Sequence, residues 1–206
     1  MAITTYSELK TSIANWLNRD DLTTQIPDFI SLAEENASLL VRHWRMENRA
    51  TATLDSQYEA LPARFIAPIR LSITSGDTFT IELISQNQMV DRRAAARNTA
   101  GRPQFYALTQ GEIEVFPTPD TDYTLEMVYY EKAEALSDTN TTNWLLTHYP
   151  SVYLYGSLVH TAPFLKDDPR LQTWGTLYQS AIAAVNQDGQ NAKTSGSGAT
   201  IKIRSY

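Results

Sequence analysis

The chain has 206 residues, of which 42% are hydrophobic and 19% charged, and its formal net charge is −6. This length and composition are typical of a globular protein with one substantial core, or a core with one inserted lobe, and they exclude wholesale disorder. The negative charge argues against a dedicated nucleic-acid binder, and no apolar run approaches the length of a membrane span. We expect no signal peptide, because the first ten residues lack its pattern. Cysteine is absent, so no disulfide, thiolate nucleophile or cysteine-based zinc site can form.

The first 48 residues are predicted to form a helical hairpin. The run from Thr5 to Glu8 has the pattern of a capping box, in which a hydroxyl and a carboxylate satisfy free amides at a helix start. Apolar residues then recur at helical spacing: Tyr6, Leu9, Ile13, Trp16 and Leu17. A second helix is predicted to begin near Pro27, because proline suits the first turn of a helix. Its apolar stripe comprises Ile30, Ala33, Ala37, Leu40, Val41 and Trp44.

From about Arg49 the apolar residues recur with a period of two, which is typical of strands. The alternating residues are Ala50, Ala52 and Leu54, then Ile69, Leu71 and Ile73, and, most clearly, Tyr123, Leu125, Met127 and Tyr129. We predict five to seven short antiparallel strands in residues 49–132. A polar, arginine-rich segment from Asn87 to Ala100 is predicted to form a short helix and a loop.

Helical periodicity returns in the C-terminal part. A helix from about Pro150 is predicted to direct Val152, Tyr155, Leu158, Val159 and Ala162 inward, until Pro163 disturbs it. The last helix is predicted to have Asp168 as its N-cap and Pro169 in its first turn. It would bury Leu171, Trp174, Leu177, Tyr178, Ala181, Ile182 and Val185, and end near Gly189, ahead of a Gly/Ser linker.

These segments together predict an α+β fold. Two helical hairpins, at residues 1–48 and 137–193, pack on each other, and an antiparallel β lobe at residues 49–136 is inserted between them. An extended C-terminal arm, comprising a flexible linker and a strand-like end, occupies residues 194–206.

No group of residues in the sequence indicates catalysis or the binding of a metal or cofactor. His148 and His160 lie twelve residues apart, about 120° out of alignment on one continuous helix, so they would not bind one metal together. His43 is predicted at the polar end of a helix, and each histidine is interpreted as a surface or capping residue. A distant carboxylate pair such as Glu59 and Asp91 stays open, although nothing in the sequence singles it out. The phosphate-binding and nucleophile motifs that include glycine are absent.

The only basic concentration comprises Arg92, Arg93, Arg97 and Arg102. We favour a solvated helix face and loop, because no aromatic residues interleave with these arginines as stacking platforms for bases would require. A contact for DNA or for an acidic partner is the alternative.

The C-terminal end has an unusual composition. Residues 194–199 are only Thr, Ser, Gly and Ala, and apolar and charged residues alternate from Ile201 onward. Six residues cannot form a stable sheet alone, so Ile201 and Ile203 must pack on another surface. The residues alone leave two possibilities open: fraying or docking on the β lobe of the same chain, or strand addition to another subunit.

Several stretches resemble the tailed-bacteriophage head-to-tail adaptor, or connector, proteins. Residues 3–24, ITTYSELKTSIANWLNRDDLTT, with the following IPDFISLAEENA, resemble the opening of that family. MENRATATL and YEALPARFIAPIRL resemble the entry to its β region. Later parts follow in order: GRPQFYAL, GEIEVFPTP, YTLEMVYYEKAEALSDTNTTNWLLTHYPSVYLYGSL and APFLKDDPRLQTWGTLYQSAIAAVN. The resemblance covers almost the whole chain up to Asn186.

The resemblance implies a virion structural protein without a catalytic site, metal or cofactor. Such adaptors form a ring, commonly of twelve copies, under the portal protein at one capsid vertex, where they extend the DNA channel and present a platform for tail, nozzle or tail-fibre proteins. DNA passes through without sequence-specific binding, and no membrane is involved. The protein would be made in the host bacterial cytoplasm and reside in the virion neck.

The resemblance also assigns a role to the C-terminal arm, since the C-terminal segments of such adaptors commonly reach along the portal. It assigns portal binding to Ile201, Lys202, Ile203, Arg204 and Tyr206. The competing hypothesis is a virion-associated peptidoglycan-degrading enzyme, which would require carboxylates or a histidine converging in one cleft.

Overall fold

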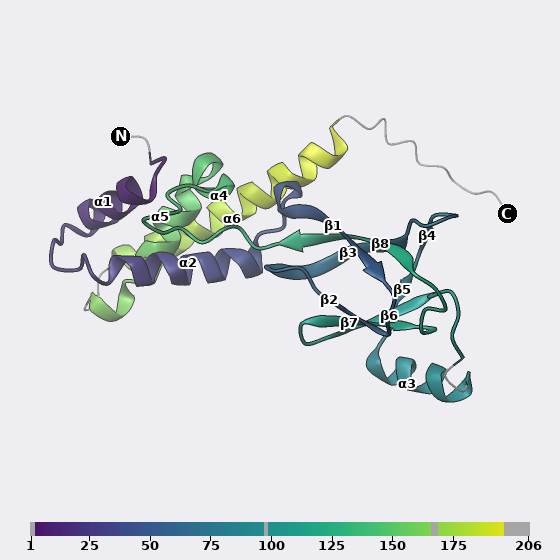
Figure 1. Ribbon diagram of the computed structural model, residues 1–206. Coiled ribbons are helices and arrows are strands. Elements are labelled where there is room, and N and C mark those ends of the chain that lie inside the picture. The colour runs from purple at the N-terminus through teal and green to yellow at the C-terminus, as the bar shows by residue number, and fades with distance from the viewer. Residues whose placement is uncertain (1–2, 97–98, 166–168, 196–206) are drawn as a thin grey trace. The chain divides into compact units, whose positions relative to one another are not determined.

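The computed structural model describes residues 3–96, 99–165 and 169–195, and the chain divides into two compact units (Figure 1). One unit comprises the residues up to Met46 and those from Lys132 onward, and we call it the helical unit. The other is Glu47–Glu131, the β unit. The fold is α+β, as the sequence predicts, with helices at both ends of the chain and strands between them. Among the described residues, no helix has both the length and the apolar character needed to cross a membrane.

The helical unit begins with α1, Tyr6–Leu17, and α2, Ile26–Leu40. The predicted capping box is confirmed: the Thr5 side chain accepts a hydrogen bond from the Glu8 amide, and the Glu8 side chain accepts one from the Thr5 amide. Pro27 lies in the first turn of α2, as expected. The predicted apolar stripe of α2 is too long, because the chain turns to extended geometry at Val41. Leu40 is therefore exposed at the helix end, and Trp44 belongs to a separate short 3-10 helix, η1, Trp44–Met46.

In the C-terminal part of this unit, the residues that the structure describes form α4, Trp144–His148; α5, Pro150–Val159; η2, Ala162–Phe164; and α6, Arg170–Thr194. Because α5 packs against α1, α2, α4 and α6, it is buried on several sides, and its buried residues do not follow a single stripe. The prediction for this helix was correct at Val152 and Leu158, whereas Tyr155 and Val159 are half-buried and Ala162 is exposed.

Close packing at Gly156 brings three helices together. A Cβ atom at this position would lie 3.0 Å from the Tyr178 ring of α6 and 3.1 Å from the Ala33 Cβ of α2. A larger residue would require the Tyr178 ring or α2 to shift, so the two predicted hairpins meet at a tightly packed site that favours glycine.

Helix α6 is longer than the sequence predicts, since it continues through Gly189 to Thr194. Trp174, Tyr178, Ile182 and Val185 are buried as expected, but Leu177 is exposed, and Leu171 and Ala181 are half-buried. Pro169 occupies the N-cap position, and the predicted N-cap Asp168 lies outside the described residues.

The described residues of the β unit form eight short strands in two four-stranded sheets, rather than five to seven strands. One sheet has the order β1 (Glu47–Leu54), β8 (Tyr123–Glu131), β3 (Phe65–Ile73), β4 (Phe79–Thr80). The other has the order β2 (Tyr58–Ala60), β7 (Glu112–Phe116), β6 (Phe105–Thr109), β5 (Glu82–Leu83). All the strand pairs are antiparallel except β5 with β6, which is parallel.

Alternating residues of both sheets share one core, which includes Leu54, Leu71, Tyr106, Ile113, Leu125 and Met127. Ile69 was predicted to be buried with Leu71 but is exposed, because the pairing of β3 with β8 shifts register between Pro68 and Arg70. The predicted short helix in the arginine-rich segment is confirmed as α3, Gln86–Ala95. It places Met89 in a second core with Ala107 and Phe116, on the other face of the second sheet.

Candidate functional site

The residues assigned to portal binding are not tested by the structure. Ile201, Lys202, Ile203, Arg204 and Tyr206 all lie outside the described residues, as does Arg97 of the basic concentration.

The three histidines do not form a metal site, and no group of three or more potential ligands occurs in the described parts of the chain. His148 is exposed, as expected. His160 is half-buried beside Asn36, its Nε2 lying 3.1 Å from the Asn36 Nδ2, and burial lowers its pKa. The interpretation of His43 as a surface or helix-capping residue was wrong: it follows α2 in the connecting segment and is only 1% exposed.

The carboxylate pair that the sequence left open does not converge. Glu59 pairs with Ile113 and so points toward the core between the two sheets. Asp91 lies on α3, which covers the opposite face of the second sheet. The sheet therefore separates the two carboxylates. Burial raises the pKa of Glu59, with a smaller contribution from Asp55.

Arg92 on α3 and Arg102 in the following loop are exposed, as the prediction of a solvated helix face and loop expects, whereas Arg93 is half-buried and bound within the β unit. Arg93 donates to Glu114 Oε1 at 2.8 Å and to the Val115 carbonyl at 2.6 Å, and its side chain is only 14% exposed. The guanidinium of Arg92 lies 3.8 Å from the centre of the Phe105 ring. Arg102 stacks on Phe79 at 3.6 Å and donates to the Asp77 carbonyl. Aromatic partners thus exist for these cations, but they are distant in sequence and were not visible as an interleaved pattern.

A cluster of polar side chains lies where the chain leaves α2 and heads toward β1. We call it the connector clamp: His43 of the connecting segment, Tyr149 between α4 and α5, and Asn186, Asp188 and Gly189 of α6. The Arg45 amide donates to His43 Nδ1 at 3.1 Å, so the neutral ring carries its hydrogen on Nε2. That nitrogen lies 3.3 Å from Asp188 Oδ2 and 3.3 Å from the Tyr149 hydroxyl.

Two further contacts complete the connector clamp. Asn186 accepts a hydrogen bond from the Arg42 amide at 2.7 Å and donates one to the Leu40 carbonyl at 3.0 Å, so its amide satisfies backbone groups at the end of α2. Gly189 lies so close to His43 that a Cβ would be 2.9 Å from the ring Cδ2 and 3.1 Å from the His43 Cα. The His43 ring also stacks on Trp144, with centroids 5.4 Å apart.

The electrostatics of the connector clamp follow from this geometry. Burial, together with the hydrogen bond to Asp188, raises the pKa of Tyr149 to about 12. The hydrogen bonds from Tyr149 and His43 lower the pKa of Asp188. Asp188 therefore acts as an ionised acceptor at the exposed edge of the cluster, and the Tyr149 hydroxyl and the His43 ring face it.

A second polar cluster holds the segment through which the chain returns from β8 to α4. Glu34 of α2 accepts hydrogen bonds from the Leu136 amide at 2.8 Å and from the Tyr153 hydroxyl at 3.2 Å. Asn143, the N-cap of α4, donates to the Tyr153 hydroxyl at 2.6 Å and to the Glu134 carbonyl at 2.7 Å. Burial raises the pKa of both Glu34 and Tyr153.

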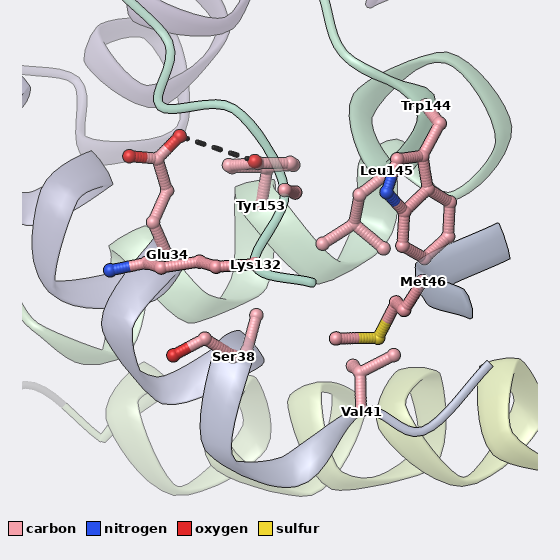
Figure 2. Close-up of a pocket in the computed structure, with 10 residues that line it drawn as sticks. Glu34, Ser38, Val41, Met46, Lys132, Trp144, Leu145 and Tyr153 are labelled. Carbon is pink, nitrogen blue, oxygen red and sulfur yellow. Dashed lines mark hydrogen bonds between the residues drawn. The ribbon is translucent and has the colours of Figure 1, made fainter. Parts of the chain in front are cut away.

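A small pocket lies beside Glu34 and Tyr153 of this second cluster (Figure 2). Glu34 and Tyr153 line one end, and Val41, Met46 and Leu145 line the other. The pocket has about 20 Å³ of free space, which is comparable to one water molecule and too small for an organic substrate. Its position, between the outgoing and the returning segment, suits a structural joint rather than a site of chemistry.

The fold and these clusters describe a protein whose organised polar groups hold chain segments in place. Comparison with protein families agrees: the family model described as SU10 adaptor protein matches residues 4–201. The chain therefore belongs to the SU10 adaptor protein family of phage adaptors, which confirms the resemblance seen in the sequence. No curated protein matches the chain significantly.

Proposed function

We propose that this phage structural adaptor forms a ring, with twelve copies as the expected number, that joins the portal to the tail and extends the DNA channel. The ring resides in the virion neck, retains the packaged genome and lets it leave during ejection. Membership of the adaptor family is the observation that carries this proposal. Tail, nozzle or tail-fibre proteins would bind the ring on the side away from the portal.

The charge distribution supports a role beside DNA. The β unit, Glu47–Glu131, contains seven Arg, no Lys and twelve Asp or Glu, so it has a formal charge of −5 out of −6 for the whole chain. Four of its arginines, Arg49, Arg64, Arg70 and Arg93, form ion pairs with carboxylates of the same unit. A channel lined by such a surface would repel phosphates and let DNA slide. A ring structure with a basic channel would contradict this part of the proposal.

Attachment to the portal is assigned to the C-terminal arm, with Ile201 and Ile203 as apolar anchors and Lys202, Arg204 and Tyr206 as polar contacts. The isoleucines provide the apolar surface for strand addition, and the preceding Gly/Ser residues provide reach.

The test is to mix the purified protein with its portal and examine both by size-exclusion chromatography and electron microscopy. We expect a ring of density under the portal with full-length protein. A variant that ends at Ser195 keeps α6 intact and should stay folded but no longer bind. If the truncated protein attached to portals normally, the arm mechanism would be wrong. If the full-length protein did not attach at all, the adaptor role at the portal would be wrong.

A further inference from the structure

The end of α6 is helical although its sequence disfavours a helix. Residues 186–195, NQDGQNAKTS, include Gly189, Asp188, two Asn and a Thr, all of which are weak helix formers. The sequence by itself therefore predicts that the helix ends near Gly189, whereas α6 continues to Thr194. A tertiary contact must supply the missing stability.

The connector clamp is that contact. Residues 186–195 are described throughout, and Gly189 is the one buried residue among them. Three sets of contacts lie on one side of the last turns of α6. Gly189 packs against His43, and Asp188 accepts a hydrogen bond from Tyr149. Asn186 forms hydrogen bonds with the backbone of Leu40 and Arg42. By contrast, Val185 and the buried residues before it hold the earlier turns through ordinary apolar packing.

We propose that the connector clamp is a latch that sets the length of the C-terminal arm. While it is closed, residues 186–194 lie in α6. When it opens, these residues unwind and join the arm. Nine residues span about 14 Å as a helix and about 30 Å as an extended chain, so opening adds roughly 16 Å of reach. That the added reach serves attachment to the portal rests on the proposed function, whereas the opening and closing of the latch do not.

The position of the latch links the arm to the connection between the two units. His43, Leu40 and Arg42 belong to the segment through which the chain leaves α2 toward β1. A pull on the arm would thus act on the end of α2 and on the residues that lead into the β unit. Release would change the arm length and free this segment at the same time.

Two substitutions distinguish stabilisation of the helix end by the latch from stabilisation by intrinsic helix propensity. Gly189→Ala raises helix propensity but places a methyl group against His43, and Asp188→Ala raises propensity while it removes the acceptor for Tyr149 and His43. Propensity alone predicts a more stable helix end in both variants, whereas the latch predicts unwinding. Asn191→Ala, at an exposed position on the same turns, is the matched control: helix propensity rises, one surface hydrogen bond from Gln187 Nε2 is lost, and no contact of the connector clamp changes.

The first measurement is amide hydrogen exchange over residues 189–195 of the isolated full-length protein. We expect exchange to be about tenfold or more faster in Gly189→Ala and Asp188→Ala, the size expected when hydrogen bonds to a charged group are lost, and unchanged or slower in Asn191→Ala. Exchange in residues 174–185 should stay protected in all the variants, which shows that each one folds. Unchanged or slower exchange in both latch variants would overturn the proposal. Wild-type exchange at the rate of an unstructured chain would overturn it too.

The second measurement is a distance. Because the chain has no cysteine, Ser180→Cys with Ser195→Cys provides a clean pair for spin labels. The closed helix spans about 22 Å between these positions. We expect this distance in the otherwise wild-type chain, and a longer, broader distribution once Asp188→Ala is added. An unchanged distance would contradict the latch. Both measurements use the protein without its portal, so a failure of portal binding would sink the proposed function and leave this result standing.

Discussion

Tyr149 donates a hydrogen bond to Asp188 Oδ2 at 2.5 Å, and the same carboxylate oxygen lies 3.3 Å from His43 Nε2. In the sequence, Tyr149 lies 39 positions from Asp188, and His43 lies 145 positions from it. The Asp188 carboxylate thus joins α6 to the segment that follows α2 and to Tyr149, and it holds the connector clamp together.

Tyr149→Phe should lower the melting temperature, because it removes the phenol from this cluster and leaves Asp188 with the imidazole only. Tyr155→Phe is the matched control, since Tyr155 is half-buried on α5 and contacts Trp16 through its ring. Thermal unfolding followed by circular dichroism measures both, and equal melting temperatures would show that the hydrogen bond contributes nothing.

The ionisation of Tyr149 gives a pH test of the same contact. Its pKa rises from 10.0 to about 12 in the folded protein, so its contribution to stability is fully present below pH 10 and is lost as the pH rises through about 12. The difference spectrum near 295 nm, wild type minus Tyr149→Phe, should show this late titration. A step near pH 10 would indicate a solvated phenol.

Glu34→Gln should make stability less dependent on pH. Burial raises the pKa of Glu34 above 4.5 in the folded state, so its favourable contribution is fully present below pH 4.5 and is lost as the pH rises through the folded value. The glutamine side chain is neutral at every pH and can still accept the hydrogen bond from the Leu136 amide, so the variant does not lose stability in this way. We therefore expect it to be more stable than wild type at pH 7 and above. Glu35→Gln, on the exposed face of α2, is the control. Denaturant unfolding at several pH values measures the effect, and a variant that loses stability at neutral pH would contradict it.

Gly156→Ala and Gly175→Ala should have opposite effects although both lie inside helices. The first places a methyl group 3.0 Å from Tyr178 and 3.1 Å from Ala33, and we expect a loss of about 1–3 kcal/mol from overpacking. The second meets nothing within 4 Å and should gain about 0.5–1 kcal/mol, since alanine is the better helix former. The free energy of unfolding in urea tests the pair, and a stabilising Gly156→Ala would refute the close packing of α2, α5 and α6.

Arg93→Ala should destabilise the β unit by about 3–5 kcal/mol, because it leaves the Glu114 carboxylate buried without its ion-pair partner. Arg92→Ala, which removes a cation stacked on Phe105 at the surface, should cost about 1 kcal/mol or less. Comparable losses for the two would argue against a buried ion pair. The same variants test the alternative DNA contact: salt-dependent binding of duplex DNA that falls equally in both would favour it.

The sequence by itself determined the order and type of the main elements. The capping box at Thr5, Pro27 in the first turn of α2 and the alternation from Tyr123 to Tyr129 are local signals, and each is satisfied by neighbours in the chain. The family followed from ordered stretches along almost the whole chain.

Only the tertiary structure decided how long α6 is, where His43 lies and what the arginines contact. Each depends on partners far apart in sequence: Gly189 against His43, Asp188 beside Tyr149, and Arg93 on Glu114. A local pattern describes what a segment prefers when it is isolated. A weak helix former such as Gly189 becomes helical only when contacts with distant residues stabilise that conformation. The free energy of those contacts depends on residues outside the segment, so the segment's own sequence does not reveal it.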